Sequence, residues 1–281
     1  MRASFDRAAI PYWDARATAW KIVPPLSPSD DDVRFYAARA ALNVPANGRP
    51  MRALLLGVTR SIALMPWSAG TRLLALDWAS NMIRSVWPGE SVPPQFHAVR
   101  GDWREIPLAS GALDFVVGDG CYSTFADLEG PAAMNREVHR ALRPGGEFCL
   151  RCFRRPAKPV PIGQLFAWLF SGRYSNLDLF RWMLAMAVHG DSREGVSVHS
   201  VWRIWHEHVP DPEEHRARLG WTPEAVANME NWGRLETRYV FPTLAELEAL
   251  AAPHFDLVAC DLPRYEWGEQ FPRLAMRRRA G

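Results

Sequence analysis

Residues 52–57 read RALLLG and residues 72–77 read RLLALD. Each is a short apolar run of the kind that forms a buried parallel strand, and the first ends in glycine while the second ends in an acid. Similar runs predict further strands at 95–102, 113–120 and 147–153, with helices at 79–86 and 131–142. Strands that alternate with helices predict right-handed βαβ units, and therefore a mostly parallel sheet with helices on both faces.

The segments outside this alternation divide the chain further. Residues 1–50 predict an N-terminal helical cap, and residues 51–160 the Rossmann-like core. Amphipathic patterns at 161–236 predict an inserted helical lid. Residues 237–281 predict a helix and two last strands, which would complete a seven-stranded sheet.

Composition narrows the class of protein. The chain has 281 residues with 33 Lys+Arg against 31 Asp+Glu, a net charge of +2. This balance disfavours a protein that binds nucleic acid mainly through its charge. No uncharged stretch is long and apolar enough to cross a membrane, and four cysteines make no disulfide framework. We therefore expect a cytoplasmic protein with a small-molecule substrate and leave the oligomeric state open, a homodimer included.

Acidic residues follow three of the predicted strands. Asp77, Asp102 and Asp119 stand where the strands end, and parallel strands place those ends along one edge of the sheet. Carboxylates there suit ribose hydroxyls, an exocyclic amine and a free ammonium, whereas a polyphosphate requires cations or bare helix N-termini. The simpler alternative is that each acid only caps the helix that follows it.

The order of these motifs resembles the class I S-adenosylmethionine (SAM)-dependent methyltransferases. The matching stretches are LLLGVT at 54–59, LALDWASNMI at 74–83, GDWREIPL at 101–108, ALDFVVGDG at 112–120 and ALRPGGEF at 141–148. The resemblance implies SAM as cofactor, S-adenosylhomocysteine (SAH) as product, and methyl transfer by in-line displacement in which catalysis is mainly positioning.

The resemblance also implies a set of cofactor-binding residues. Asp77 would accept hydrogen bonds from the two ribose hydroxyls, Asp102 from the adenine amine, and backbone at Gly57 would approach the methionyl part. Trp78 and Trp103 would lie against the adenine. The full set is Gly57, Val58, Thr59, Asp77, Trp78, Met82, Gly101, Asp102, Trp103, Gly118 and Asp119.

One position departs from the family pattern. Leu55 stands where the family's first motif usually has an acid that helps to hold the methionyl amine. Asp119 is the candidate replacement, and the Thr59 hydroxyl is the second. This departure motivates an alternative function, a catalytically silent SAM-binding or regulatory protein of the same fold.

The sequence contains fewer motifs that indicate how a methyl acceptor would be bound or activated. His189 is the candidate general base, and the alternative is a surface-loop histidine. His206 and His208 point apart on a helix, so we expect no metal site. A nicotinamide-dependent oxidoreductase is disfavoured because no G-x-G-x-x-G follows the first strand.

Overall fold

The computed structural model describes residues 22–279, so residues 1–21 of the predicted cap lie outside the described residues. These residues form two compact units. Unit 1 comprises the chain up to Tyr122, Glu129–Phe153 and the chain from Ala245 onward. Unit 2 comprises Ser123–Leu128 and Arg154–Leu244.

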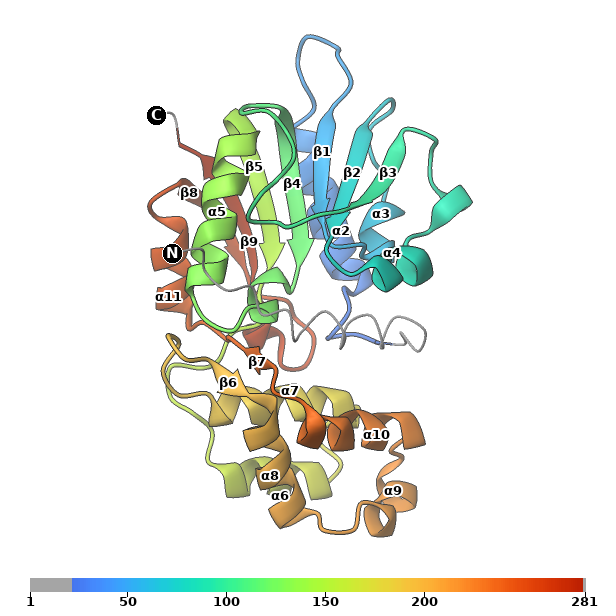
Figure 1. The fold of residues 1–281 in the computed structure, drawn as a ribbon, viewed down its shortest axis with the longest axis vertical. Helices are drawn as coiled ribbons and strands as arrows, with labels where there is room; N and C mark the ends of the chain where they lie inside the picture. The colour runs from blue at the N-terminus through green and yellow to red at the C-terminus, as the bar shows by residue number, and fades with distance from the viewer. Residues whose placement is uncertain (1–21, 280–281) are drawn as a thin grey trace. The chain divides into compact units, whose positions relative to one another are not determined.

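A seven-stranded sheet forms the centre of unit 1 (Figure 1). Its order is β3-β2-β1-β4-β5-β9-β8, and β9 alone runs in the direction opposite to the other six strands. The strands are β1 (Arg52–Leu56), β2 (Arg72–Asp77), β3 (Phe96–Arg100), β4 (Leu113–Asp119), β5 (Leu142–Arg151), β8 (Phe255–Asp261) and β9 (Arg273–Arg278). The predicted fold class, a Rossmann-like and mostly parallel seven-stranded sheet, is confirmed.

Helices cover both faces of this sheet. They are α2 (Asp30–Leu42), α3 (Arg60–Ala63), α4 (Ser80–Val86), α5 (Glu129–Ala141) and α11 (Leu244–Ala251). Side chains of α2, α3 and α4 pack in one buried cluster with Leu55 of β1 and Ala75 of β2. On the opposite face, His139 of α5 contacts Phe255 of β8. Short 3-10 turns occur at Gly89–Ser91, Cys121–Thr124 and Gly268–Gln270.

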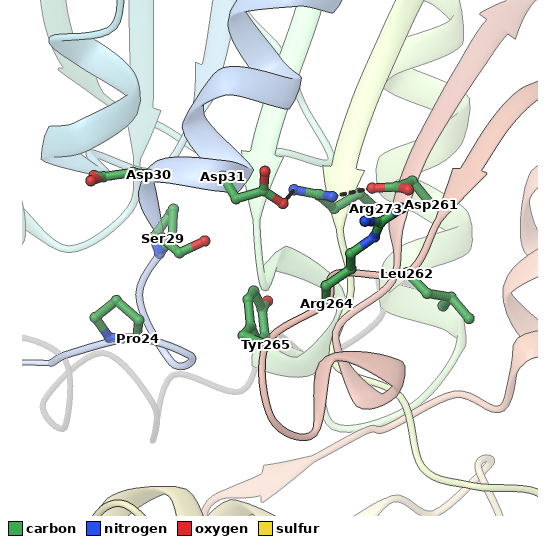
Figure 2. Close-up of a pocket in the computed structure, with 10 residues that line it drawn as sticks. Pro24, Ser29, Asp30, Asp31, Asp261, Leu262, Arg264, Tyr265 and Arg273 are labelled. Atoms are coloured by element: carbon green, nitrogen blue, oxygen red, sulfur yellow. Dashed lines mark hydrogen bonds and ion pairs between the residues drawn. The ribbon is translucent and has the colours of Figure 1, made fainter.

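The start of α2 is fixed by a capping box. Ser29 Oγ accepts the N–H of Asp32, and the Asp32 carboxylate accepts the N–H of Ser29. This arrangement satisfies two backbone donors that a helix start would otherwise leave open. The loop before α2 and the loop between β8 and β9 border a cavity (Figure 2).

Unit 2 is mainly helical. Its helices are α6 (Ile162–Phe170), α7 (Leu177–Val188), α8 (Val198–His208), α9 (Glu213–Leu219) and α10 (Pro223–Asn231), followed by a 3-10 turn at Trp232–Arg234. Two-residue strands β6 (Val196–Ser197) and β7 (Arg238–Tyr239) pair antiparallel. Within residues 22–279, every helix is too short or too polar to cross a bilayer.

Candidate functional site

The carboxyl ends of the parallel strands meet at one edge of the unit 1 sheet. The chain leaves β1 toward β2 on one side, while β4 pairs with β1 on the other. Such a reversal of strand order opens a crevice above the sheet, which is where ligands bind in open α/β folds. Leu56 pairs with Gly118 across the two strands, so the ends of β1 and β4 flank this crevice.

Gly57 makes the turn that leaves β1. Its φ is +88°, a conformation that L side chains rarely adopt, and its N–H donates to the Leu76 carbonyl at 2.8 Å. A Cβ at this position would lie 3.8 Å from both Asp77 Oδ2 and Trp103 Cζ2. The predicted residues Gly57, Asp77 and Trp103 therefore converge on one point.

Asp77 ends β2 with its two oxygens in different environments. Oδ1 accepts the N–H of Ala79 at 2.9 Å, whereas Oδ2 faces the Gly57 turn. The N-cap of α4 is Ala79, and its side chain makes no capping hydrogen bond. Asp77 thus lies two positions before the N-cap, and the helix start alone does not account for a carboxylate that is 6% exposed.

Trp103 follows β3 and reaches back across β2. Its indole Nε1 donates to the Leu76 carbonyl at 2.5 Å, the same oxygen that the Gly57 N–H contacts. Gly101 allows this approach of β3 to β2, because a Cβ there would lie 2.5 Å from Leu76 Cδ1. The indole is therefore held at the crevice edge by a backbone carbonyl.

Asp102 pairs with a neighbour at the end of β3. Its carboxylate accepts the Arg104 backbone N–H at 2.9 Å and the Arg104 guanidinium, with Nη2 3.1 Å from Oδ2. Both side chains are about one-fifth exposed. A ligand amine at Asp102 would therefore share the carboxylate with Arg104, in a partly hydrated environment.

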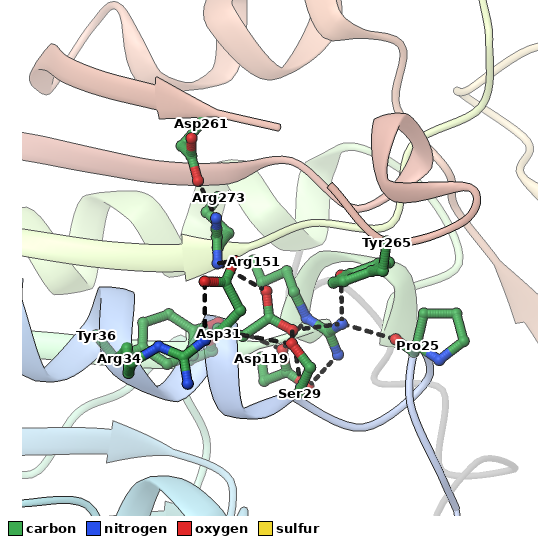
Figure 3. Close-up of polar contacts among 12 residues, drawn as sticks. Pro25, Ser29, Asp31, Arg34, Tyr36, Asp119, Arg151, Asp261, Tyr265 and Arg273 are labelled. Atoms are coloured by element: carbon green, nitrogen blue, oxygen red, sulfur yellow. Dashed lines mark hydrogen bonds and ion pairs between the residues drawn. The ribbon is translucent and has the colours of Figure 1, made fainter. Parts of the chain in front are cut away.

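Asp119 at the end of β4 is more buried than Asp102 and has more hydrogen-bond partners (Figure 3). Arg151 Nε lies 2.6 Å from Oδ1 and Nη2 lies 3.0 Å from Oδ2. The Tyr36 hydroxyl lies 3.3 Å from Oδ1 and 3.2 Å from the carbonyl oxygen of Gly118. Burial raises the pKa of Asp119 above its usual value, and Arg151 opposes that rise. A methionyl ammonium would have to compete with Arg151 for this carboxylate.

Arg151 is a buried residue that the sequence analysis did not single out. Besides Asp119, its guanidinium donates to the carbonyls of Pro25 at 2.6 Å and Leu26 at 3.3 Å, and to Tyr265 Oη at 3.1 Å. The side chain is fully buried. An arginine within a predicted strand was the only sequence signal, and its partners lie 32 to 126 positions away.

The remaining predicted residues have mixed surroundings. Val58 and Met82 are buried in the hydrophobic cluster of unit 1, and Trp78 packs against it. Thr59 precedes α3 without a side-chain capping bond. Leu55, where the resemblance would place an acid, is fully buried in the same cluster and carries no polar group toward a ligand.

His189 lies in unit 2, at the C-terminal end of α7. It is 4% exposed, its Nδ1 lies 3.1 Å from the Gly190 carbonyl, and its ring is 6.0 Å from that of Phe241. The alternative of a surface-loop histidine is therefore wrong. Among residues 22–279, no three His, Cys, Asp or Glu side chains are grouped as a metal site requires.

Comparison with known proteins gives one family and many related folds. The family model described as "Methyltransferase domain" matches residues 54–150. No protein with a curated description matches the sequence. A Rhodobacter sphaeroides structure described as putative Zn-dependent alcohol dehydrogenases is 15% identical, with a TM-score of 0.64 over 99% of this chain and 100% of that one.

Two further solved structures are described as methyltransferases. A SAM-dependent methyltransferase from Methanosarcina mazei is 15% identical, with a TM-score of 0.52 over 91% of this chain and 100% of that one. The N-methyltransferase NodS from Bradyrhizobium japonicum, in complex with SAH, is 10% identical, with a TM-score of 0.50 over 95% and 97%. At these identities the structural likeness concerns the fold.

Proposed function

We propose that this chain is a class I, SAM-dependent methyltransferase of a small-molecule acceptor, which the match of residues 54–150 to the methyltransferase-domain model supports. The observation that carries the proposal is the convergence of the Gly57 turn and the Asp77 carboxylate at the strand-order reversal. The near-neutral charge of the chain supports a small acceptor over a nucleic acid.

The residues at the crevice fit the cofactor's nucleoside. SAM, when bound, supplies the methyl group. Asp77 is a carboxylate at the position where two adjacent hydroxyls can be accepted, and Gly57 places bare backbone beside it. We propose that Asp77 holds the ribose, that Asp102 accepts from the adenine amine, and that Trp78 and Trp103 bound the adenine.

The methionyl end is proposed to rely on backbone more than on a free carboxylate. Leu55 supplies no charge, and the Asp119 carboxylate is shared with Arg151. Peptide groups at Gly57, Val58 and Gly118, with the Thr59 hydroxyl, are the groups we assign to this end. Asp119 would reach the ammonium only as a member of its ion pair.

We propose His189 of unit 2 as the candidate base for methyl transfer. Replacement of His189 by Gln tests this assignment, because it keeps a polar side chain of similar size and removes the titrating imidazole. We expect slower methyl transfer with unchanged SAH affinity. Equal transfer rates for the two proteins would remove His189 from the mechanism.

The missing first-motif acid specifically favours a second candidate, a SAM-binding protein without transferase activity. Both candidates predict that SAH raises the melting temperature. They differ in single-turnover reactions with methyl-labelled SAM and a metabolite extract, where only the enzyme moves label onto a small molecule. SAH binding without any labelled product would contradict the proposed activity, and a melting shift with NADH in place of SAH would contradict the cofactor.

A further inference from the structure

A cavity of about 720 Å³ lies in unit 1 between the loop that enters α2 and the loop between β8 and β9 (Figure 2). Arg273, one of its lining residues, opens β9 and pairs with Arg151 at the carboxyl end of β5. The cavity therefore stands at the same edge of the sheet as the Gly57 turn.

Three charged side chains that line the cavity, Asp31, Asp261 and Arg273, form ion pairs with one another. Arg273 Nη1 lies 2.8 Å from Asp31 Oδ2, and Nη2 is hydrogen-bonded to Asp261 (Figure 2). Arg273 lowers the pKa of Asp31, so this carboxylate stays ionised at neutral pH. The trio leaves a net negative charge on one side of the cavity.

Two other charged side chains at the cavity have no partner within residues 22–279. Asp30 and Arg264 both line it, and neither makes a hydrogen bond or ion pair with any described residue. Asp30 comes from the first turn of α2, whereas Arg264 comes from the loop between β8 and β9. Among the described residues, the cavity thus offers one anion and one cation without a charged partner, from two different elements.

The Tyr265 hydroxyl adds a hydrogen-bond donor to the residues that line the cavity. Its Oη accepts from Arg151 Nη1 at 3.1 Å, so its own proton is left for another acceptor, and no described residue provides one. Burial raises the pKa of Tyr265 to about 12, so the hydroxyl stays protonated at neutral pH. Because Arg151 is fixed on Asp119 and on the Pro25 carbonyl, the phenol is held by a rigid partner (Figure 3).

We propose that this cavity binds a small zwitterion of the amino-acid class. Its ammonium group would lie at Asp30 beside the ionised Asp31, and its carboxylate would accept from Arg264 and Tyr265. Leu262, which is 48% exposed at the cavity, offers an apolar surface to a side chain. A polyphosphate is disfavoured, because three carboxylates line the cavity against two guanidinium groups.

Resting on the proposed function, the zwitterion is the methyl acceptor and its nitrogen is the methylated atom. The ammonium first releases a proton to the base of the proposed function, for which His189 is the candidate, and the nitrogen lone pair then forms the N–C bond with the methyl group of SAM. The bond between that methyl carbon and the sulfonium sulfur breaks, and its electron pair goes to sulfur, which leaves SAH and an N-methylammonium product.

The test is a melting-temperature screen of the full chain, with and without SAH, against the twenty standard L-amino acids. Each hit is then measured again as the amine without its carboxylate and as the acid without its amine. We expect at least one amino acid to raise the melting temperature, and loss of either charge to weaken its binding at least about tenfold. Labelled SAM should also transfer its methyl group to the hit.

Two variants keep this test specific. Arg264→Gln and Asp30→Asn should each weaken the hit's binding about tenfold or more and leave SAH binding unchanged. Glu266→Gln, an exposed neighbour outside the lining, is the matched control and should change neither.

The outcomes separate the inference from the proposed function. If SAH binds and no amino acid does, or if both variants bind the hit like the wild type, the inference is overturned and the proposed function stands. If SAH fails to bind, the proposed function fails, while amino-acid binding is still scored on the protein without SAH.

Discussion

The ends of β2 and β4 present the same local sequence feature, an acid closing a buried parallel strand, with different outcomes. One carboxylate oxygen of Asp77 accepts the N–H of Ala79 in the following turn, and the other faces Gly57. Both carboxylate oxygens of Asp119 accept hydrogen bonds from the fully buried Arg151, and one of them also accepts from Tyr36. The same residue type thus borders the crevice at β2, where we propose that it binds the ligand, whereas at β4 it forms a buried ion pair, and its partners decide which.

The largest effect should come from breaking the β4 pair. Arg151→Met would leave Asp119 buried without its counter-charge, which lowers the free energy of unfolding by about 3–5 kcal/mol. Urea unfolding followed by tryptophan fluorescence measures this loss. Arg104→Gln, in the partly exposed pair at Asp102, is the control and should lose at most about 1 kcal/mol. Similar losses for the two variants would refute the distinction.

A smaller effect is expected at the turn after β1. Gly57→Ala forces a side chain into φ +88° and should lower the free energy of unfolding by about 1–2 kcal/mol while weakening SAH binding. Gly111→Ala is the matched control, because its φ is +70° and a Cβ there would meet no atom within 4 Å. It should lose comparable stability and keep full SAH affinity, and parallel losses of affinity would contradict the role of Gly57.

Tyr36→Phe should lower the free energy of unfolding by less than Gly57→Ala does. It removes one hydroxyl shared between Gly118 and Asp119, and a buried hydrogen bond of this kind contributes about 1 kcal/mol. Because the Asp119–Arg151 contacts remain, we expect unchanged SAH affinity by calorimetry. A variant as stable as the wild type that has lost SAH affinity would instead place Tyr36 in the ligand site.

The last prediction concerns the pH dependence of stability at Asp114, a third carboxylate, near the start of β4. Burial acts to raise the pKa of Asp114, but Arg49, the Arg52 N–H and Arg143 together hold that pKa below 3.8. The unfolded chain therefore binds the proton first, and the stability from this group is lost as pH falls from 3.8 through the lower, folded pKa. Unfolding measured at several acidic pH values should show a shallower decline in Asp114→Asn, and parallel curves for the two proteins would contradict this assignment.

The sequence predicted the sheet well because its strands are continuous apolar runs. Residues 72–77 were predicted as the strand that β2 forms, and the helix expected to begin at Pro131 begins two residues earlier, at Glu129. Within the predicted helical segment 161–236, α9 has no amphipathic pattern of its own, because none of its residues is buried. The paired strands β6 and β7 have two residues each, too few for any pattern.

The candidate site was predictable only in part. Asp77 and Gly57 follow from motif order, since each stands at the end of its own strand. The Arg151–Asp119 pair depends on the register of β4 against β5, which no local pattern records. The cavity charges at Asp30 and Arg264 come together only through the packing of α2 beside the loop between β8 and β9.

Calorimetric titration of SAH into the wild type and Asp77→Asn tests the central claim most directly. The substitution keeps the size of the side chain and removes the charge that we assign to the ribose hydroxyls. The account predicts one SAH bound by the wild type and binding at least about tenfold weaker in the variant, with the melting temperature without ligand unchanged. Equal affinity in the two proteins would contradict it and leave Asp77 as part of the turn after β2.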